Sequence, residues 1–292
     1  MQGSDAIRRR NAWWGLAPAF AVLAMFFSAY AIFLHTSLQP GTSGGAAAGG
    51  WTLDNYARYF ASANERSVLW RTMRISAELT LASVLIGYPM AYVIVRCASS
   101  GLRKFLMISL VVTFLSGTVT RAYAWLIILG NSGLVNTVLR KSGLIDAPLR
   151  LVYNEIGVFI ALLHFVLPFF VLTMMAPLKN IPRALEDAAV NLGASRWRTF
   201  FLVTLPLSVP GIVAASSLTF AVALSSFLFP MVLGGGRVRM AANAIYEHIF
   251  QAFDLPFAAA SATVFLVIAL FFVWVFGMLQ HVLRLGPSDR LR

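Results

Sequence analysis

Long runs without a charged residue constrain this chain more than any other feature of its sequence. No Asp, Glu, Lys or Arg occurs between Arg198 and Arg237, or within residues 255–283. A helix needs about 20 mostly apolar residues to cross the hydrocarbon core of a bilayer, and both runs exceed that length. The sequence therefore predicts an all-α, polytopic membrane helix bundle. We expect six transmembrane helices, near residues 12–35, 75–96, 105–130, 156–178, 208–233 and 256–283.

The composition supports a membrane protein and excludes several other classes. Hydrophobic residues make up 59% of the chain and charged residues 12%, whereas soluble domains carry about 25% charged residues. Cys97 is the only cysteine, which excludes a disulfide within the chain. The net charge of +12 is spread along the sequence and forms no dense basic block, so we expect lipid around the chain and no nucleic acid as a partner.

The distribution of Lys and Arg predicts the orientation in the membrane. Of the 23 basic residues, 13 fall in the tails and loops on the side of both termini, nine fall on the other side, and Arg121 lies within a span. Cytoplasmic loops are enriched in Lys and Arg. We therefore expect both termini in the cytoplasm, with residues 1–11 as a cytoplasmic tail and residues 12–292 as a single transmembrane domain.

The segment 180–206 lies on this cytoplasmic side, between the fourth and fifth expected spans, and is too polar to cross the bilayer. Pro182 suits the first turn of a helix. Glu186 and Asp187 follow early in that helix, where the helix dipole favours carboxylates. Gly193 can supply a left-handed stop. The segment is therefore expected to start with a short helix that ends in a tight turn.

A second short helix is expected directly after this turn. Ser195 can cap it, and Pro206 and Pro210 are expected to end it and to begin the fifth span. Small residues keep the turn narrow, so that another backbone or ring can approach: Ala188, Ala189, Gly193 and Ala194. A purely structural loop remains an alternative. A DNA-reading helix-turn-helix is disfavoured, because spans hold both ends of the segment near the membrane.

The same segment resembles a known signature. "DAAVNLGASRWRTFFLVTLP" is similar to the EAA motif of membrane subunits of binding-protein-dependent ABC importers, which reads Glu-Ala-Ala, three residues, Gly, nine residues, Ile, one residue, Leu-Pro. The matching positions are Asp187, Ala188, Ala189, Gly193, Val203, Leu205 and Pro206. Asp187 replaces Glu and Val203 replaces Ile; Glu186, next to the shorter Asp187, could take over its ion pair with the partner.

The resemblance implies a type I ABC importer permease fold in the inner (plasma) membrane, in which this segment forms coupling helices that dock on an ATP-hydrolysing subunit. The implied coupling residues are Glu186, Asp187, Ala188, Ala189, Gly193, Ala194 and Pro206. The implied partners are a cytoplasmic ABC ATPase dimer that binds ATP and Mg, a second permease subunit, and a periplasmic or extracellular substrate-binding protein. Residues 87–96, 129–136 and 233–249 resemble the spermidine/putrescine branch, which implies a polyamine or a related amine or opine as solute.

The chain itself is not expected to be an enzyme or to hold a cofactor. It contains no Gly-x-x-x-x-Gly-Lys-Ser/Thr motif for ATP phosphates. Its four histidines are scattered, with no pair at metal-ligand spacing. A self-contained secondary carrier is the main alternative, although no convincing internal repeat supports it. A membrane scaffold without transport activity is a third possibility.

Polar groups within spans predict a solute pathway, because they are costly in lipid. Candidate pathway residues are Arg121, Tyr123, Trp125, Ser225, Ser226 and Phe227. Two alternatives stay open: Arg121 can snorkel or pair with an acid such as Glu78, and the two serines can bond within their own helix. In the last outer loop, Glu247 and Asp254 are placed to meet an arriving cation.

Overall fold

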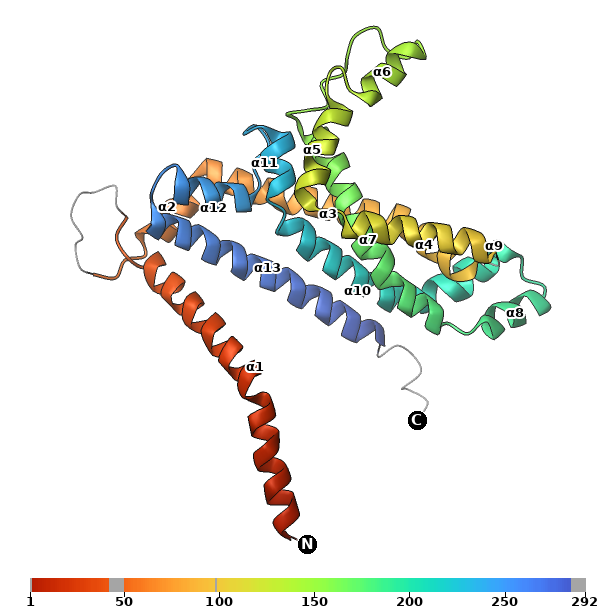
Figure 1. The fold of residues 1–292 in the computed structure, drawn as a ribbon, viewed down its shortest axis with the longest axis horizontal. Coiled ribbons are helices and arrows are strands. Elements are labelled where there is room, and N and C mark those ends of the chain that lie inside the picture. The colour runs from red at the N-terminus through yellow and green to blue at the C-terminus, as the bar shows by residue number, and fades with distance from the viewer. Residues whose placement is uncertain (1, 42–49, 98, 285–292) are drawn as a thin grey trace. The chain divides into compact units, whose positions relative to one another are not determined.

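The computed structural model describes residues 2–41, 50–97 and 99–284, with side chains from residue 18 onward, and this part of the chain is helical without strands (Figure 1). The helices are α1 (Gln2–Ser37), α2 (Asp54–Ala61), α3 (Ala63–Arg96), α4 (Ser100–Leu115), α5 (Thr118–Leu129), α6 (Leu134–Lys141), α7 (Glu155–Asn180), α8 (Arg183–Asn191), α9 (Arg196–Thr199), a π-helical segment (Phe200–Thr204), α10 (Leu205–Leu224), α11 (Leu228–Gly234), α12 (Ala241–Phe250) and α13 (Leu255–Arg284).

Six helical stretches in the described residues are long and apolar enough to cross a membrane, which confirms the predicted number of spans. They are Pro18–Ser37, Ala63–Arg96, Thr118–Lys141, Glu155–Asn180, Arg196–Leu224 and Leu255–Leu283. In lipid, a helix satisfies its own backbone hydrogen bonds, so this all-helical architecture is what the apolar runs require.

The helix bounds differ from the expected spans at four places. α1 begins at Gln2, ten residues before the first expected span. α3 begins at Ala63 and has 34 residues, about 51 Å, so it extends well beyond a hydrocarbon core of about 30 Å. The third expected span, 105–130, is divided between α4 and α5 by Ser116 and Gly117. The fifth begins earlier, at Arg196, and its helix ends at Leu224.

The chain divides into two compact units, which are described separately. Unit 1 comprises residues 1–65 and 245–265. Asn55, which is buried, donates hydrogen bonds from Nδ2 to the carbonyl oxygens of Ser37 (3.0 Å) and Gln39 (2.8 Å). These bonds fix α2 against the end of α1. Burial, and secondarily the charge of Glu65, raises the pKa of Tyr59 on α2 from 10.0 to about 12.

Unit 2 comprises residues 66–244 and 266–292, and α7 is its central helix. α10 packs along α7, and α4, α5 and α11 lie against it as well. Because lipid tails are as apolar as the side chains, close packing replaces the hydrophobic effect as the force between such helices. At Gly211 on α10, an added Cβ would lie 2.5 Å from the Pro177 side chain of α7, so only glycine permits this approach.

Candidate functional site

The segment 180–206 forms a helical hairpin at the C-terminal end of α7 (Figure 1). Gly193 has φ +89°, and the Ala194 N–H donates to the Ala189 carbonyl at 3.0 Å, which closes the end of α8. The Ser195 hydroxyl then accepts the Arg198 N–H at 3.3 Å and caps α9. The predicted left-handed stop and the predicted cap are both confirmed.

The second helix of the hairpin continues into the membrane without a break. Pro206 lacks an N–H, and its ring would clash with the carbonyl four residues earlier in a regular α-helix. The wider π-helical turn of Phe200–Thr204 lies immediately before it, and the Leu205 N–H reaches back five residues to the Phe200 carbonyl. The expectation that Pro206 and Pro210 end this helix is therefore wrong. The hairpin joins α10 directly.

Glu186 connects the first helix of the hairpin to α3 and to the π-helical segment. Its Oε1 lies 2.9 Å from Arg96 Nη2 at the end of α3, and it accepts the Thr204 hydroxyl at 2.9 Å. Arg96 also donates to the Ile181 carbonyl at 3.0 Å, where the hairpin begins. The Arg96 and Glu186 side chains are only 11% and 17% exposed. One carboxylate thus links α3, α8 and the π-helical segment.

The two neighbouring acids of α8 therefore have different environments. Asp187, which occupies the motif position, is exposed, and so is Ala188; Ala189 and Ala194 are half-buried. Glu186 makes an ion pair within the chain, with Arg96, and not the expected one with a partner. Sequence reasoning did not identify Arg96 or Thr204 as its partners, because 90 residues separate Glu186 from Arg96 and no local pattern joins them.

The outer surface of the hairpin carries large apolar side chains that the described residues leave uncovered. These are Leu185, Val190, Leu192, Trp197, Phe201 and Leu202. The Trp197 and Phe201 rings are stacked with centroids 6.2 Å apart. Exposed apolar side chains gathered on one element are typical of a surface that another protein or the membrane covers.

Arg121, the predicted intramembrane cation, is buried on α5 with 8% exposure. Its guanidinium carbon lies 5.0 Å from the centre of the Phe165 ring on α7. Its Nε and Nη1 atoms make no hydrogen bond within the described chain. Glu78, considered as its partner, instead lies 3.8 Å from Arg74. A cation over an aromatic face is stabilised by the ring quadrupole, which partly compensates for burial.

Four of the other predicted pathway residues have hydrogen-bond partners of their own: Trp125, Ser225, Ser226 and Phe227. The Trp125 indole N–H donates to His164 Nδ1 at 3.2 Å, while Tyr123 is exposed. The hydroxyls of Ser225 and Ser226 both donate to the Val222 carbonyl at 3.1 Å, where α10 ends. Phe227 is half-buried, and its carbonyl accepts the Asn243 side chain at 2.9 Å. The two serines therefore terminate α10 in the way the local alternative described.

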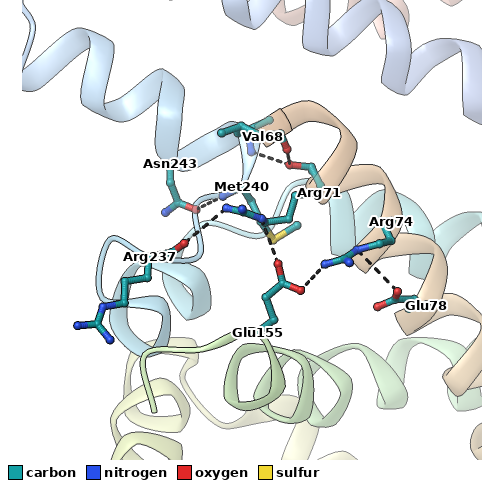
Figure 2. A network of polar contacts seen from close by, with 10 residues as sticks. Val68, Arg71, Arg74, Glu78, Glu155, Arg237, Met240 and Asn243 are labelled. Atoms are coloured by element: carbon teal, nitrogen blue, oxygen red, sulfur yellow. Dashed lines mark hydrogen bonds and ion pairs between the residues drawn. The ribbon is translucent and has the colours of Figure 1, made fainter. Parts of the chain in front are cut away.

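A second polar cluster lies at the opposite end of α7 and was missed by sequence reasoning. Glu155, the first residue of α7, ion-pairs with Arg71 at 3.1 Å and with Arg74, both on α3 (Figure 2). Arg71 also donates to the Arg237 carbonyl at 3.5 Å. α7 has 26 residues, so about 39 Å separates this cluster from the hairpin.

Asp254 in unit 1 was expected to meet an arriving cation. It is buried, its Oδ2 lies 2.7 Å from Arg58 Nη1, and its Oδ1 accepts the Phe257 N–H at 3.2 Å. The carboxylate is therefore already neutralised by Arg58 and caps the start of α13.

Comparison with known proteins identifies the family. The model of the "binding-protein-dependent transport system inner membrane component" family matches residues 80–284. The spermidine/putrescine transport system permease protein PotB of Haemophilus influenzae is 31% identical, over 80% of this chain and 81% of the relative. The inner membrane ABC transporter permease protein YdcU of Escherichia coli is also 31% identical, over 82% of this chain and 78% of the relative.

Solved structures show the same fold. A chain of the bacterial alginate ABC transporter, in complex with an alginate pentasaccharide-bound periplasmic protein, aligns over 94% of each chain with a TM-score of 0.77 and 22% identity. A chain of the MetNI methionine ABC transporter, in an inward-facing conformation, covers 76% of this chain and 99% of that chain, with a TM-score of 0.58 and 14% identity.

The family match and the shared fold decide between the interpretations of the sequence. A self-contained secondary carrier would not explain the family match and the shared fold, and neither would a scaffold without transport activity. The chain is not itself an enzyme, because ATP hydrolysis in this family belongs to a partner ATPase. The chain belongs to the binding-protein-dependent transport system inner membrane components and is a multi-pass inner-membrane permease subunit of an ABC importer.

Proposed function

We propose that this permease subunit imports a small organic solute, a polyamine or a related amine or opine, and that the 180–206 hairpin couples its movement to ATP hydrolysis. The observation that carries the coupling role is the Glu186 ion pair with Arg96, which ties an exposed apolar hairpin to α3. A hairpin attached in this way moves as a rigid body with the spans that hold it. The relatives named for spermidine and putrescine support the solute class.

The proposed assembly has three further components. A cytoplasmic ABC ATPase dimer binds ATP and Mg and receives the exposed side of the hairpin around Asp187, Ala188 and Leu192. A second permease subunit completes the pore, and a periplasmic or extracellular binding protein delivers the solute. The excess of Lys and Arg on the side of the hairpin supports cytoplasmic termini.

Purification of the tagged chain from its native membrane in mild detergent tests this proposal. We expect an ABC ATPase and a second permease to co-purify, and ATP-dependent uptake of one of three radiolabelled candidates, spermidine, putrescine or an opine, when the binding protein is added to vesicles. A chain that is recovered alone and catalyses uptake without ATP would contradict the proposal and restore the secondary carrier.

A further inference from the structure

A polar pocket of about 440 Å³ opens where α5 ends, at the same end of α7 as the Glu155 cluster. It is lined by Leu126, Gly130, Asn131, Arg150, Val152, Tyr153 and Arg237. Small-molecule sites usually have volumes of about 300–1,000 Å³ and a few convergent polar groups. The pocket therefore has the size and the lining of a site for a small solute.

The backbone of Arg237 is held by the Glu155 cluster. Arg71 donates to the Arg237 carbonyl, and Glu155 in turn fixes Arg71. Figure 2 shows the Arg237 side chain pointing away from this network. The Glu155 cluster therefore contacts the backbone of Arg237 and not its guanidinium group.

Arg150 lies on a second fixed loop. The fully buried Asn136 of α6 accepts the Leu149 N–H at 2.8 Å and donates to the carbonyls of Leu149 and Gly130, both at 3.0 Å. The Asn154 side chain also donates to the Arg150 carbonyl. The two arginines of the pocket thus come from separate loops, each held in place by side-chain hydrogen bonds.

Tyr153, which lines the pocket, has a strained backbone conformation. Tyr153 has φ +61°, which is uncommon for a residue other than glycine, and its N–H donates to the Leu233 carbonyl at 2.7 Å. Gly235 has φ +52°, and an added Cβ there would overlap the Tyr153 ring. Strain of this kind costs about 1–3 kcal/mol and is concentrated at functional sites.

The charge of the pocket is positive and uncompensated within the described chain. No carboxylate lines it, and no described acid forms an ion pair with Arg150 or Arg237. Glu155 is already occupied by Arg71 and Arg74. Asp146 lies four residues before Arg150 but is not part of the lining. Two guanidinium groups beside an amide and a phenol favour an anionic ligand, since the planar fork of Arg matches a carboxylate or a phosphate. Among the solute classes proposed above, opines carry carboxylates.

We propose that this pocket binds the imported solute through a carboxylate group. The inference rests on the proposed importer function and narrows its substrate class: the solute carries at least one carboxylate, and a polyamine, which has only amines, is excluded. Because the pocket and the hairpin lie at opposite ends of α7, the pocket is reached from the side on which the binding protein delivers its ligand.

The test uses the complete transporter with Asn131→Cys as a reporter in a Cys97→Ser chain, since Cys97 is the only native cysteine of this chain. Reaction of the introduced thiol with anionic sulfonatoethyl and cationic trimethylammonioethyl methanethiosulfonate is followed by mass spectrometry. We expect the anionic reagent to be favoured about tenfold by the local positive potential. Arg150→Gln with Arg237→Gln should abolish this preference.

A second arm measures protection against neutral methyl methanethiosulfonate by two four-carbon probes of opposite charge, succinate and putrescine. We expect succinate to slow the reaction, putrescine to leave it unchanged, and the double Gln variant to lose the protection. Protection by putrescine, no charge preference, or a charge preference without protection by succinate would each overturn the proposal.

A third arm identifies the source of the carboxylate. The unliganded binding protein could protect the thiol only when both arginines are present, while succinate gives no protection. In that case the carboxylate belongs to the binding protein, and the solute site is refuted. ATP hydrolysis stimulated by the binding protein is measured on the same samples. If the binding protein stimulates hydrolysis but the pocket shows no anion site, only this inference is refuted. If the binding protein does not stimulate hydrolysis, the proposed function is refuted.

Discussion

The substitution Glu186→Gln weakens the attachment of the hairpin to α3 without changing the surface proposed to dock on the ATPase. The change keeps the size of the side chain and an acceptor for the Thr204 hydroxyl, but it removes the negative charge opposite Arg96. Hydrogen bonds to charged groups contribute about 1.5–3 kcal/mol, whereas exposed ion pairs contribute about 0–1 kcal/mol. Both side chains are mostly buried, so a loss of about 2 kcal/mol is expected, or about 30-fold in the equilibrium between attached and detached hairpin.

The assay is uptake per ATP hydrolysed, measured in vesicles that contain the complete transporter and its binding protein. Glu186→Gln should leave the co-purified ATPase and its basal hydrolysis nearly unchanged, because the altered side chain faces α3 and not the exposed side of the hairpin. Uptake per ATP should fall by about tenfold or more. The upper limit is about 30-fold, which corresponds to a loss of about 2 kcal/mol.

Glu78→Gln is the matched control. Glu78 is 51% exposed and lies 3.8 Å from Arg74 in an i,i+4 pair on α3, about 27 Å along the helix from Arg96. It should retain both uptake and hydrolysis. Equal uptake per ATP in the Glu186 and Glu78 variants would refute the role assigned to the ion pair.

Three further predictions concern other parts of the chain. Gly193→Val should abolish uptake while the chain still inserts into the membrane, because φ +89° strains a β-branched residue; full uptake would contradict the tight turn. Arg121→Ala should change the KM or rate of uptake without loss of the co-purified ATPase, and unchanged kinetics would leave Arg121 with a structural role. The pKa of Tyr59 is raised from 10.0 to about 12, so the folded state keeps this proton where the unfolded chain loses it. Stability is then full below pH 10 and falls as the pH rises towards 12; thermal unfolding from pH 9 to 12 should show a smaller fall in Tyr59→Phe, and identical curves would contradict the shift.

The helical architecture and the hairpin could be predicted because both depend on local sequence. Charge-free runs longer than a bilayer core require helices wherever they occur. Gly193 and Ser195 act within a few residues of their positions, so their roles could be derived from the sequence alone. The prediction for the two prolines was wrong for a related reason: Pro206 indicates a helix end only if the preceding turn is α-helical, and here the π-helical turn accommodates it.

The polar contacts that hold the spans together could not be predicted in the same way. Glu155 meets Arg71 and Arg74 across more than 80 residues, and nothing in the local sequence distinguishes these arginines from charges that only mark a helix end. The same holds for Arg150 and Arg237, which share a pocket only because two separate loops are fixed beside α5. Such pairings follow from the packing of helices and loops, which one sequence does not reveal.

The most direct test of the central claim, that the hairpin is the contact with the ATPase, is site-specific photocrosslinking from Leu192, which is 89% exposed at its tip. Leu192 is replaced by p-benzoylphenylalanine in the complete transporter, and the crosslinked chain is identified by mass spectrometry. Leu144, which is 72% exposed and precedes the opposite end of α7 in the sequence, is the control position. The account predicts a crosslink to the ATPase from Leu192 and none from Leu144. An intact complex in which Leu192 crosslinks only to lipid or to the second permease would contradict it.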